Sequence, residues 1–131
     1  MFAFLLTVCC IWLFDPPVLV AEGTASYYTR ESGAITASGE AFDENAFTCA
    51  MREGTFGGLY LVAAENGRNV VCRLNDRGPH ARGRIIDLSK GAMERLAATE
   101  EGLVHVRVYR LQLDFPPRFM DTVSVKKNEG T

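Results

Sequence analysis

The chain has 131 residues, of which 47% are hydrophobic and 23% are charged. This length suffices for one hydrophobic core and is too short for two domains. The formal net charge is -2 at pH 7, so the molecule lacks the basic field that attracts nucleic acids. The composition therefore indicates one globular domain and argues against a nucleic-acid partner.

An almost wholly apolar run opens the chain, from Met1 to Phe14. A helix that crosses a bilayer core needs about twenty apolar residues, and this run is closer in length to the apolar region of a signal peptide. We therefore expect residues 1–21 to be an export signal, although no Lys or Arg precedes the run. Lipid anchoring through Cys9 is the alternative, but Val8 stands where a lipoprotein signal usually has a small residue.

The predicted elements begin with a short strand from Gly23 to Tyr28, which is rich in strand-forming residues. Residues 30–46 have little periodicity, as is typical of a long surface connection that can carry function. Phe47–Met51 predicts a second short strand. Leu59–Ala64 and Asn69–Leu74 then flank an Asn-Gly dipeptide, which tolerates the positive φ values of tight hairpins, so a hairpin is expected there.

The second half of the chain predicts two more strands and one helix. Ile85–Leu88 is a brief apolar strand interrupted by one acid, and Ser89 follows where a helix N-cap is expected. Lys90–Ala98 spaces apolar residues along one helical face, so we expect one short helix. Leu103–Leu113 alternates polar and apolar residues, which is typical of a half-buried strand, and we expect His105 on its exposed side.

Six short strands and one helix make a small, mostly antiparallel barrel the expected fold. We place it over residues 22–113. The prolines after Asp114 end the last strand, and a polar tail of residues 114–131 follows without any apolar period.

Two cysteines remain if the predicted leader is removed, because Cys9 and Cys10 leave with it. Two cysteines in an oxidising compartment suggest a disulfide. We predict that Cys49 and Cys72 bridge neighbouring strands in the exported protein. The alternative is a pair of small buried thiols, since cysteine is often fully buried.

Four sequence blocks lie in order along the predicted barrel. They are Gly23-Thr24-Ala25-Ser26-Tyr27-Tyr28, Thr36-Ala37-Ser38-Gly39-Glu40 with Asp43, Asn75-Asp76-Arg77-Gly78-Pro79, and Arg82-Gly83-Arg84-Ile85-Ile86-Asp87-Leu88-Ser89. Together they resemble the rare lipoprotein A (RlpA) family over residues 23–112. The resemblance implies a six-stranded double-psi β-barrel and an exported bacterial protein of the periplasm or cell envelope. It also implies lytic cleavage of peptidoglycan glycan strands during wall remodelling or daughter-cell separation.

Asp87 is the predicted catalytic acid. Cleaving a glycosidic bond requires protonation of the leaving oxygen, and in a lytic reaction one carboxyl group can act first as acid and then as base. Such a group keeps its proton best in apolar surroundings, and Asp87 lies between Ile86 and Leu88. The resemblance implicates Glu40 and Asp43 as further acids, which would position the sugar or stabilise developing positive charge.

Five further residues are predicted to bind substrate: Tyr28, Ser38, Asp76, Arg77 and His80. An aromatic ring such as that of Tyr28 can stack on a sugar face. Arg77 would bind substrate hydroxyls or hold a neighbouring acid ionised. For Asp76 a structural role is the alternative, because Asp before Arg-Gly-Pro is typical of a turn whose carboxylate accepts backbone N–H groups.

One residue departs from the family pattern. Many members have Thr-Ala-Ala-His where this chain reads Thr48-Cys49-Ala50-Met51, and that His is thought to assist catalysis. Met51 cannot carry a proton, so the carboxylates act alone, another group replaces the His, or activity is lost. His80, beside the Asp-Arg-Gly-Pro turn, is the nearby candidate replacement.

The resemblance thus implies an endolytic peptidoglycan transglycosylase, and we expect it to work as a monomer without a cofactor. No metal is expected, since His80 and His105 lack the paired spacing of a zinc site. The alternative function is a non-catalytic, expansin-like module that binds cell-wall polysaccharide.

Overall fold

The computed structural model describes residues 16–29, 35–96 and 98–112. Pro17–Leu111 form one compact unit, and only Pro16 and Gln112 of a second unit lie in the described part of the chain. The apolar run with Cys9 and the predicted polar tail lie outside the described residues.

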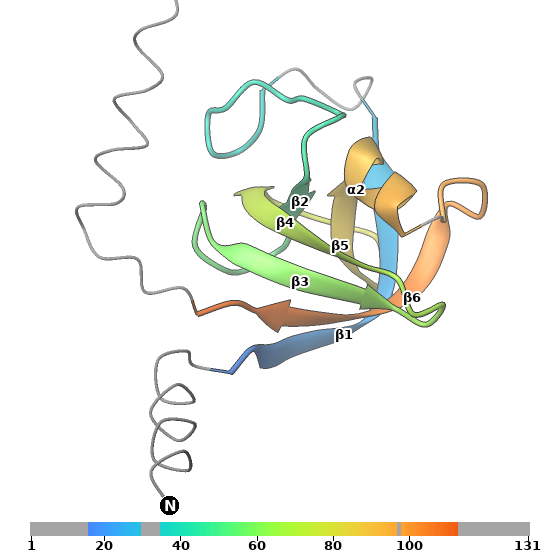
Figure 1. The fold of residues 1–131 in the computed structure, drawn as a ribbon. Helices are drawn as coiled ribbons and strands as arrows, with labels where there is room; N and C mark the ends of the chain where they lie inside the picture. The colour runs from blue at the N-terminus through green and yellow to red at the C-terminus, as the bar shows by residue number, and fades with distance from the viewer. Residues whose placement is uncertain (1–15, 30–34, 97, 113–131) are drawn as a thin grey trace, which may run out of the picture. The chain divides into compact units, whose positions relative to one another are not determined.

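Six strands close into a barrel (Figure 1). They are β1 (Val18–Tyr28), β2 (Thr48–Ala50), β3 (Leu59–Ala64), β4 (Asn69–Asp76), β5 (Arg84–Ser89) and β6 (Leu103–Arg110). Their order around the barrel is β1-β5-β2-β4-β3-β6, and pairing of β6 with β1 closes the ring. Among the described residues there is one helix, α2 (Lys90–Arg95). The predicted six-stranded barrel with one short helix is confirmed.

Two of the strand pairs are parallel, β1 with β5 and β2 with β4, whereas the other pairs are antiparallel. Ser26 on β1 pairs with Asp87 on β5. Asp87 pairs in turn with Ala50 on β2, and Ala50 pairs with Asp76 on β4. These four residues form one line across four strands, which we call the four-strand row.

Buried aliphatic side chains fill the inside of the barrel. The strands β3 and β4 alternate buried residues with exposed or half-buried ones, as expected when one face packs inward. Each large aliphatic side chain stabilises the fold by about 1.5–3 kcal/mol when fully buried. The largest on the strands are Leu74, Ile86, Leu88, Val62, Val106 and Val108, and Met93 of α2 and its C-cap Leu96 belong to the same core.

The predicted hairpin is confirmed. The strands β3 and β4 pair in antiparallel register from Leu59 opposite Arg73 to Ala63 opposite Asn69. Gly67 in the turn has a φ of 85°, which is a conformation that glycine adopts without steric cost.

Ser89 is the N-cap of α2, as the sequence predicts. Its Oγ accepts hydrogen bonds from the N–H of Ala92 at 3.2 Å and from the N–H of Thr48 at 3.3 Å, and it donates to the carbonyl of Ala46 at 2.5 Å. One hydroxyl therefore joins the helix to β2 and to the loop before it. The helix ends at Arg95 instead of Ala98, because the N–H of Leu96 bonds the carbonyl of Met93 in a tighter last turn.

The first strand is longer than predicted. It begins at Val18, inside the segment assigned to the export signal, because Val18 and Leu19 pair with Arg110 and Tyr109 on β6. Cleavage after Ala21 would remove this part of β1. No helix among residues 16–29, 35–96 and 98–112 has the length and apolar character needed to span a bilayer.

Candidate active site

A cleft of about 400 Å³ is lined by three of the four residues of the four-strand row. Asp87, Ala50 and Asp76 of the row line it, so the small side chain of Ala50 separates two carboxylates. Adjacent strands are about 4.8 Å apart, which puts the Cα atoms of Asp76 and Asp87 about 10 Å apart. The complete lining is Tyr28, Ile35, Thr36, Phe42, Ala50, Asp76, Arg77, His80 and Asp87.

Asp87 is half-buried on β5 between the fully buried Ile86 and Leu88. Its Oδ1 accepts a hydrogen bond from the hydroxyl of Ser26. Its Oδ2 lies beside Gly78, 3.8 Å from the position that a Cβ atom would take on that glycine. The predicted acid thus has one oxygen held by a neighbouring strand and stands in the lining of the cleft.

Asp76 lines the cleft and also makes the backbone contacts expected of a structural role. Its Oδ1 accepts hydrogen bonds from the backbone N–H of Ala37 at 2.9 Å and of Arg77 at 2.8 Å. The N–H of Ser38 also donates to the carbonyl of Asn75, at 3.1 Å. The end of β4 therefore fastens the loop that contributes Thr36 to the cleft.

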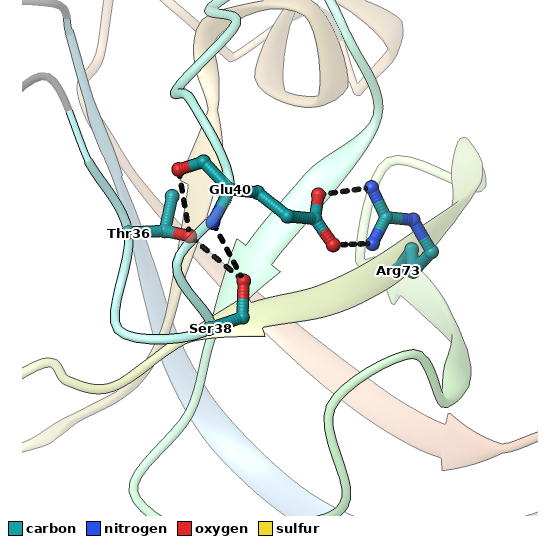
Figure 2. Close-up of polar contacts among 4 residues, drawn as sticks. All are labelled: Thr36, Ser38, Glu40 and Arg73. Atoms are coloured by element: carbon teal, nitrogen blue, oxygen red, sulfur yellow. Dashed lines mark hydrogen bonds and ion pairs between the residues drawn. The ribbon is translucent and has the colours of Figure 1, made fainter.

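Glu40 forms a bidentate ion pair with Arg73 (Figure 2), with Nη1–Oε1 at 2.5 Å and Nη2–Oε2 at 2.7 Å. These hydrogen bonds raise the pKa of Arg73. On the backbone side of Glu40, the hydroxyls of Thr36 and Ser38 lie 2.9 Å apart. Neither Glu40 nor Ser38 belongs to the cleft lining, and both make hydrogen bonds within the loop that carries Thr36.

Asp43 also lies outside the cleft lining. It is exposed, and its Oδ1 accepts a hydrogen bond from the N–H of Asn45 at 3.0 Å. This is the contact of an Asx turn, in which the side chain shapes its own loop.

Arg77 joins the cleft to the loop that follows β2. Its Nη2 donates to the carbonyl of Gly54 at 2.7 Å, and its Nη1 donates to that of Met51 at 3.4 Å. The guanidinium also lies 4.1 Å from the centre of the Phe56 ring, a distance typical of a cation–π contact. Arg77 therefore places a fixed positive charge at one edge of the cleft.

Met51 packs into the hydrophobic core, where it is 9% exposed, and does not line the cleft. His80 is exposed and does line it, together with Asp87. His105 lies on β6, with its Nε2 3.3 Å from Oε1 of Glu22, and is an exposed strand residue as predicted. Among the described residues, the imidazole in the cleft is that of His80.

Aromatic side chains form one wall of the cleft. The rings of Tyr28 and Phe42 are 4.7 Å apart between centroids, with their planes 33° apart. Burial raises the pKa of Tyr28, so the phenol stays neutral. The wall offers an apolar surface of the kind on which sugar rings stack.

Cys49 and Cys72 are free thiols, which corrects the predicted disulfide. Both are fully buried, on β2 and β4. A hydrogen bond to Cys72, together with burial, raises the pKa of Cys49 well above its ordinary value. The two side chains pack as small apolar groups, which was the alternative interpretation of the sequence.

The structure brings together Asp87, Asp76, Tyr28, Arg77 and His80, and leaves Glu40, Asp43 and Ser38 outside the cleft lining. Sequence reasoning missed Ser26 as a partner of Asp87. The two residues are far apart in the chain, and only the parallel register of β1 and β5 joins them.

Comparison with known proteins identifies relatives of the whole barrel. Residues 20–108 match the family model described as lytic transglycolase. A Treponema pallidum protein named "Probable endolytic peptidoglycan transglycosylase RlpA" is 45% identical over 95 residues, covering 71% of this chain and 30% of that protein. The endolytic peptidoglycan transglycosylase RlpA of Pasteurella multocida is 40% identical over 105 residues, covering 79% of this chain and 36% of the relative. The chain spans about a third of the length of these relatives.

Two solved structures share the fold at lower identity. The Streptomyces papain inhibitor has a TM-score of 0.59 and 21% identity, covering 76% of this chain and 98% of the inhibitor. The apo expansin of Clavibacter michiganensis has a TM-score of 0.59 and 17% identity, covering 73% of this chain and 52% of the expansin. The match of residues 20–108 to the family model carries the assignment: the chain belongs to the lytic transglycolase family and has its RlpA-like double-psi β-barrel.

Proposed function

We propose that this chain cleaves peptidoglycan glycan strands as an endolytic transglycosylase, with Asp87 as its acid and base. The observation that carries the proposal is the position of Asp87 in the lining of the cleft. Relatives named as peptidoglycan transglycosylases at 40% and 45% identity supply the substrate class.

The reaction needs one carboxyl group and no water. Asp87 gives its proton to the glycosidic oxygen as the bond from that oxygen to the anomeric carbon breaks. The 6-hydroxyl oxygen of the muramyl residue then bonds to the anomeric carbon, and its proton passes to the Asp87 carboxylate. The products are a 1,6-anhydromuramyl end and a free hydroxyl on the departing sugar, and Asp87 is protonated again.

The other lining residues bind the sugar in this scheme. The Tyr28–Phe42 wall stacks on a ring face, and Arg77 supplies a charged donor at the cleft edge. His80 assists catalysis in place of the family's usual His, whose position Met51 occupies in this chain. Its imidazole lines the same cleft as Asp87. Glu40 and Asp43 hold the loop that carries Thr36 and Phe42.

The site of action in this proposal is the cell envelope, where the substrate is found. The exported form acts as a monomer on peptidoglycan strands and uses no cofactor. Export through residues 1–21 and lipid anchoring through Cys9 remain the two routes that the sequence predicts.

Incubation of the purified chain with peptide-free glycan strands tests the proposal. We expect mass spectrometry to find 1,6-anhydromuramyl products with the wild type and none with Asp87→Asn, which removes the acid and keeps the side-chain shape. Circular dichroism of both proteins verifies their folding. A folded wild type that releases no such product would refute the enzyme.

A non-catalytic wall-binding module is the second candidate, and the burial of Met51 in the core favours it. Such a module would bind glycan strands with the same affinity in the wild type and in the Asp87→Asn variant, and neither protein would cleave them. Loss of cleavage on this substitution with binding retained selects the enzyme.

A further inference from the structure

We propose that Ser26 is a positioning residue that decides which oxygen of Asp87 carries the catalytic proton. The kinetic part of this inference rests on the proposed function. Ser26 is 5% exposed and sits on β1 directly opposite Asp87 in the parallel pair with β5. Its hydroxyl donates a hydrogen bond to Oδ1 of Asp87. Ser26 does not line the cleft, so any effect on substrate passes through Asp87.

The hydrogen bond distinguishes the two carboxyl oxygens. A protonated carboxyl group has one O–H and one carbonyl oxygen, and the carbonyl oxygen is the better acceptor for a hydroxyl donor. With Ser26 donating to Oδ1, the acidic proton of Asp87 resides on Oδ2. That oxygen lies beside Gly78, which has no side chain. It is 3.8 Å from the position that a Cβ atom would take on that glycine.

The same arrangement serves both halves of the reaction. Oδ2 releases its proton to the glycosidic oxygen and later receives the proton of the 6-hydroxyl. Throughout, Ser26 donates to Oδ1, which accepts as a carbonyl oxygen in the acid and as a carboxylate oxygen in the base. The carboxyl group therefore does not need to rotate between the two steps.

Loss of the hydroxyl should affect the reaction rate and leave binding unchanged. Without its donor, the carboxyl group of Asp87 turns about its Cβ–Cγ bond, and the fraction of molecules with the proton on Oδ2 falls. The cleft lining is unaltered, so substrate affinity is preserved. We expect Ser26→Ala to lower kcat about 10- to 100-fold, as small misplacements of reacting groups do, with KM within about twofold of wild type.

Three variants test this on peptide-free glycan strands. Ser26→Thr keeps the hydroxyl and should retain kcat within about threefold of wild type, since a β-branched residue is well accepted in a strand. Ser89→Ala is the matched control, because Ser89 is also a buried serine whose hydroxyl joins separate segments. It should lower stability and leave kcat at the wild-type level below its unfolding temperature. Ser26→Cys keeps the side-chain volume with a weak donor, and replaces the alanine variant if that one fails to fold.

A kcat in Ser26→Ala equal to that of Ser89→Ala would overturn the inference. So would a rise in KM that accounts for the whole loss, or a threonine variant as slow as the alanine variant.

A second readout does not need activity. The Cγ carbon of Asp87 reports hydrogen bonding to its carboxyl group in an NMR spectrum. We expect its chemical shift at a fixed pH to change in Ser26→Ala and to return in Ser26→Thr. An unchanged shift in Ser26→Ala would refute the contact. If the wild type cleaves no glycan, the proposed function fails, and the NMR comparison alone decides the role of Ser26.

Discussion

Asp87 and Glu40 are both carboxylates in blocks typical of the family, and their partners give them different abilities. Asp87 accepts a hydrogen bond from a serine hydroxyl and lines the cleft. Glu40 accepts hydrogen bonds on both of its carboxylate oxygens from the guanidinium of Arg73. A carboxylate in a bidentate pair with arginine accepts hydrogen bonds and is a poor proton donor. The pair suits Glu40 for holding a loop in place.

A charge exchange tests that role. We expect Glu40→Gln and Arg73→Gln each to lower kcat/KM up to about tenfold through a displaced loop, and to lower the free energy of unfolding by about 0.5–1 kcal/mol, because the pair is partly exposed. Glu40→Arg combined with Arg73→Glu restores opposite charges and should recover most of the activity. Activity is measured on glycan strands and stability by urea unfolding.

The double variant also separates the two interpretations of Glu40. A catalytic carboxylate cannot move to position 73 and keep its function. Activity of the double variant as low as that of Glu40→Gln would therefore show that Glu40 takes part in the chemistry.

At the level of elements, the junction between β5 and α2 depends on one side chain. The hydroxyl of Ser89 caps the helix and also bonds Thr48 and Ala46. We predict that Ser89→Ala lowers the free energy of unfolding by about 1–2 kcal/mol, since a cap and buried hydrogen bonds are lost together. Denaturant unfolding followed by circular dichroism measures this. Ser89→Thr keeps the hydroxyl and is the control, and an alanine variant as stable as wild type would show that the cap contributes nothing.

Local sequence signals predicted the elements well. The Asn-Gly dipeptide marked the β3–β4 hairpin, and Ser89 marked the start of α2. The start of β1 was missed because Val18 and Leu19 are exposed and apolar, like a cleavage region, and become a strand by pairing with β6. Their partners are almost the whole barrel sequence away, so no local pattern indicates them.

The candidate site could be predicted only in part, for the same reason. Blocks of sequence indicated Asp87, and the cleft does contain it with His80. The register across strands could not be read from the sequence, and this register sets Ser26 against Asp87 and leaves Ala50 between the two acids. The partner of Glu40 was equally hidden, since Arg73 reads as an ordinary strand residue.

At the scale of the whole molecule, the barrel interior keeps its two cysteines from reacting. Because the hydrogen bond to Cys72 and burial raise the pKa of Cys49, little Cys49 thiolate forms at moderately alkaline pH, and both thiols are shielded from reagents by their full burial. We predict that a chain with Cys9→Ser and Cys10→Ser shows no reactive thiol at pH 8 while folded. In guanidinium chloride without reductant, both Cys49 and Cys72 should react with a thiol reagent. A denatured protein with no free thiol would reveal a disulfide.

The four-strand row also has a consequence for folding. Its residues come from four strands that meet through two parallel pairs and one antiparallel pair, so each contact closes a long loop of chain. Long-range pairings of this kind form late and slowly. A chain with a finished β3–β4 hairpin and an open barrel would hold every residue of the proposed chemistry and still have no place for a glycan to bind. The appearance of cleavage activity during refolding should therefore coincide with the last closure of the barrel.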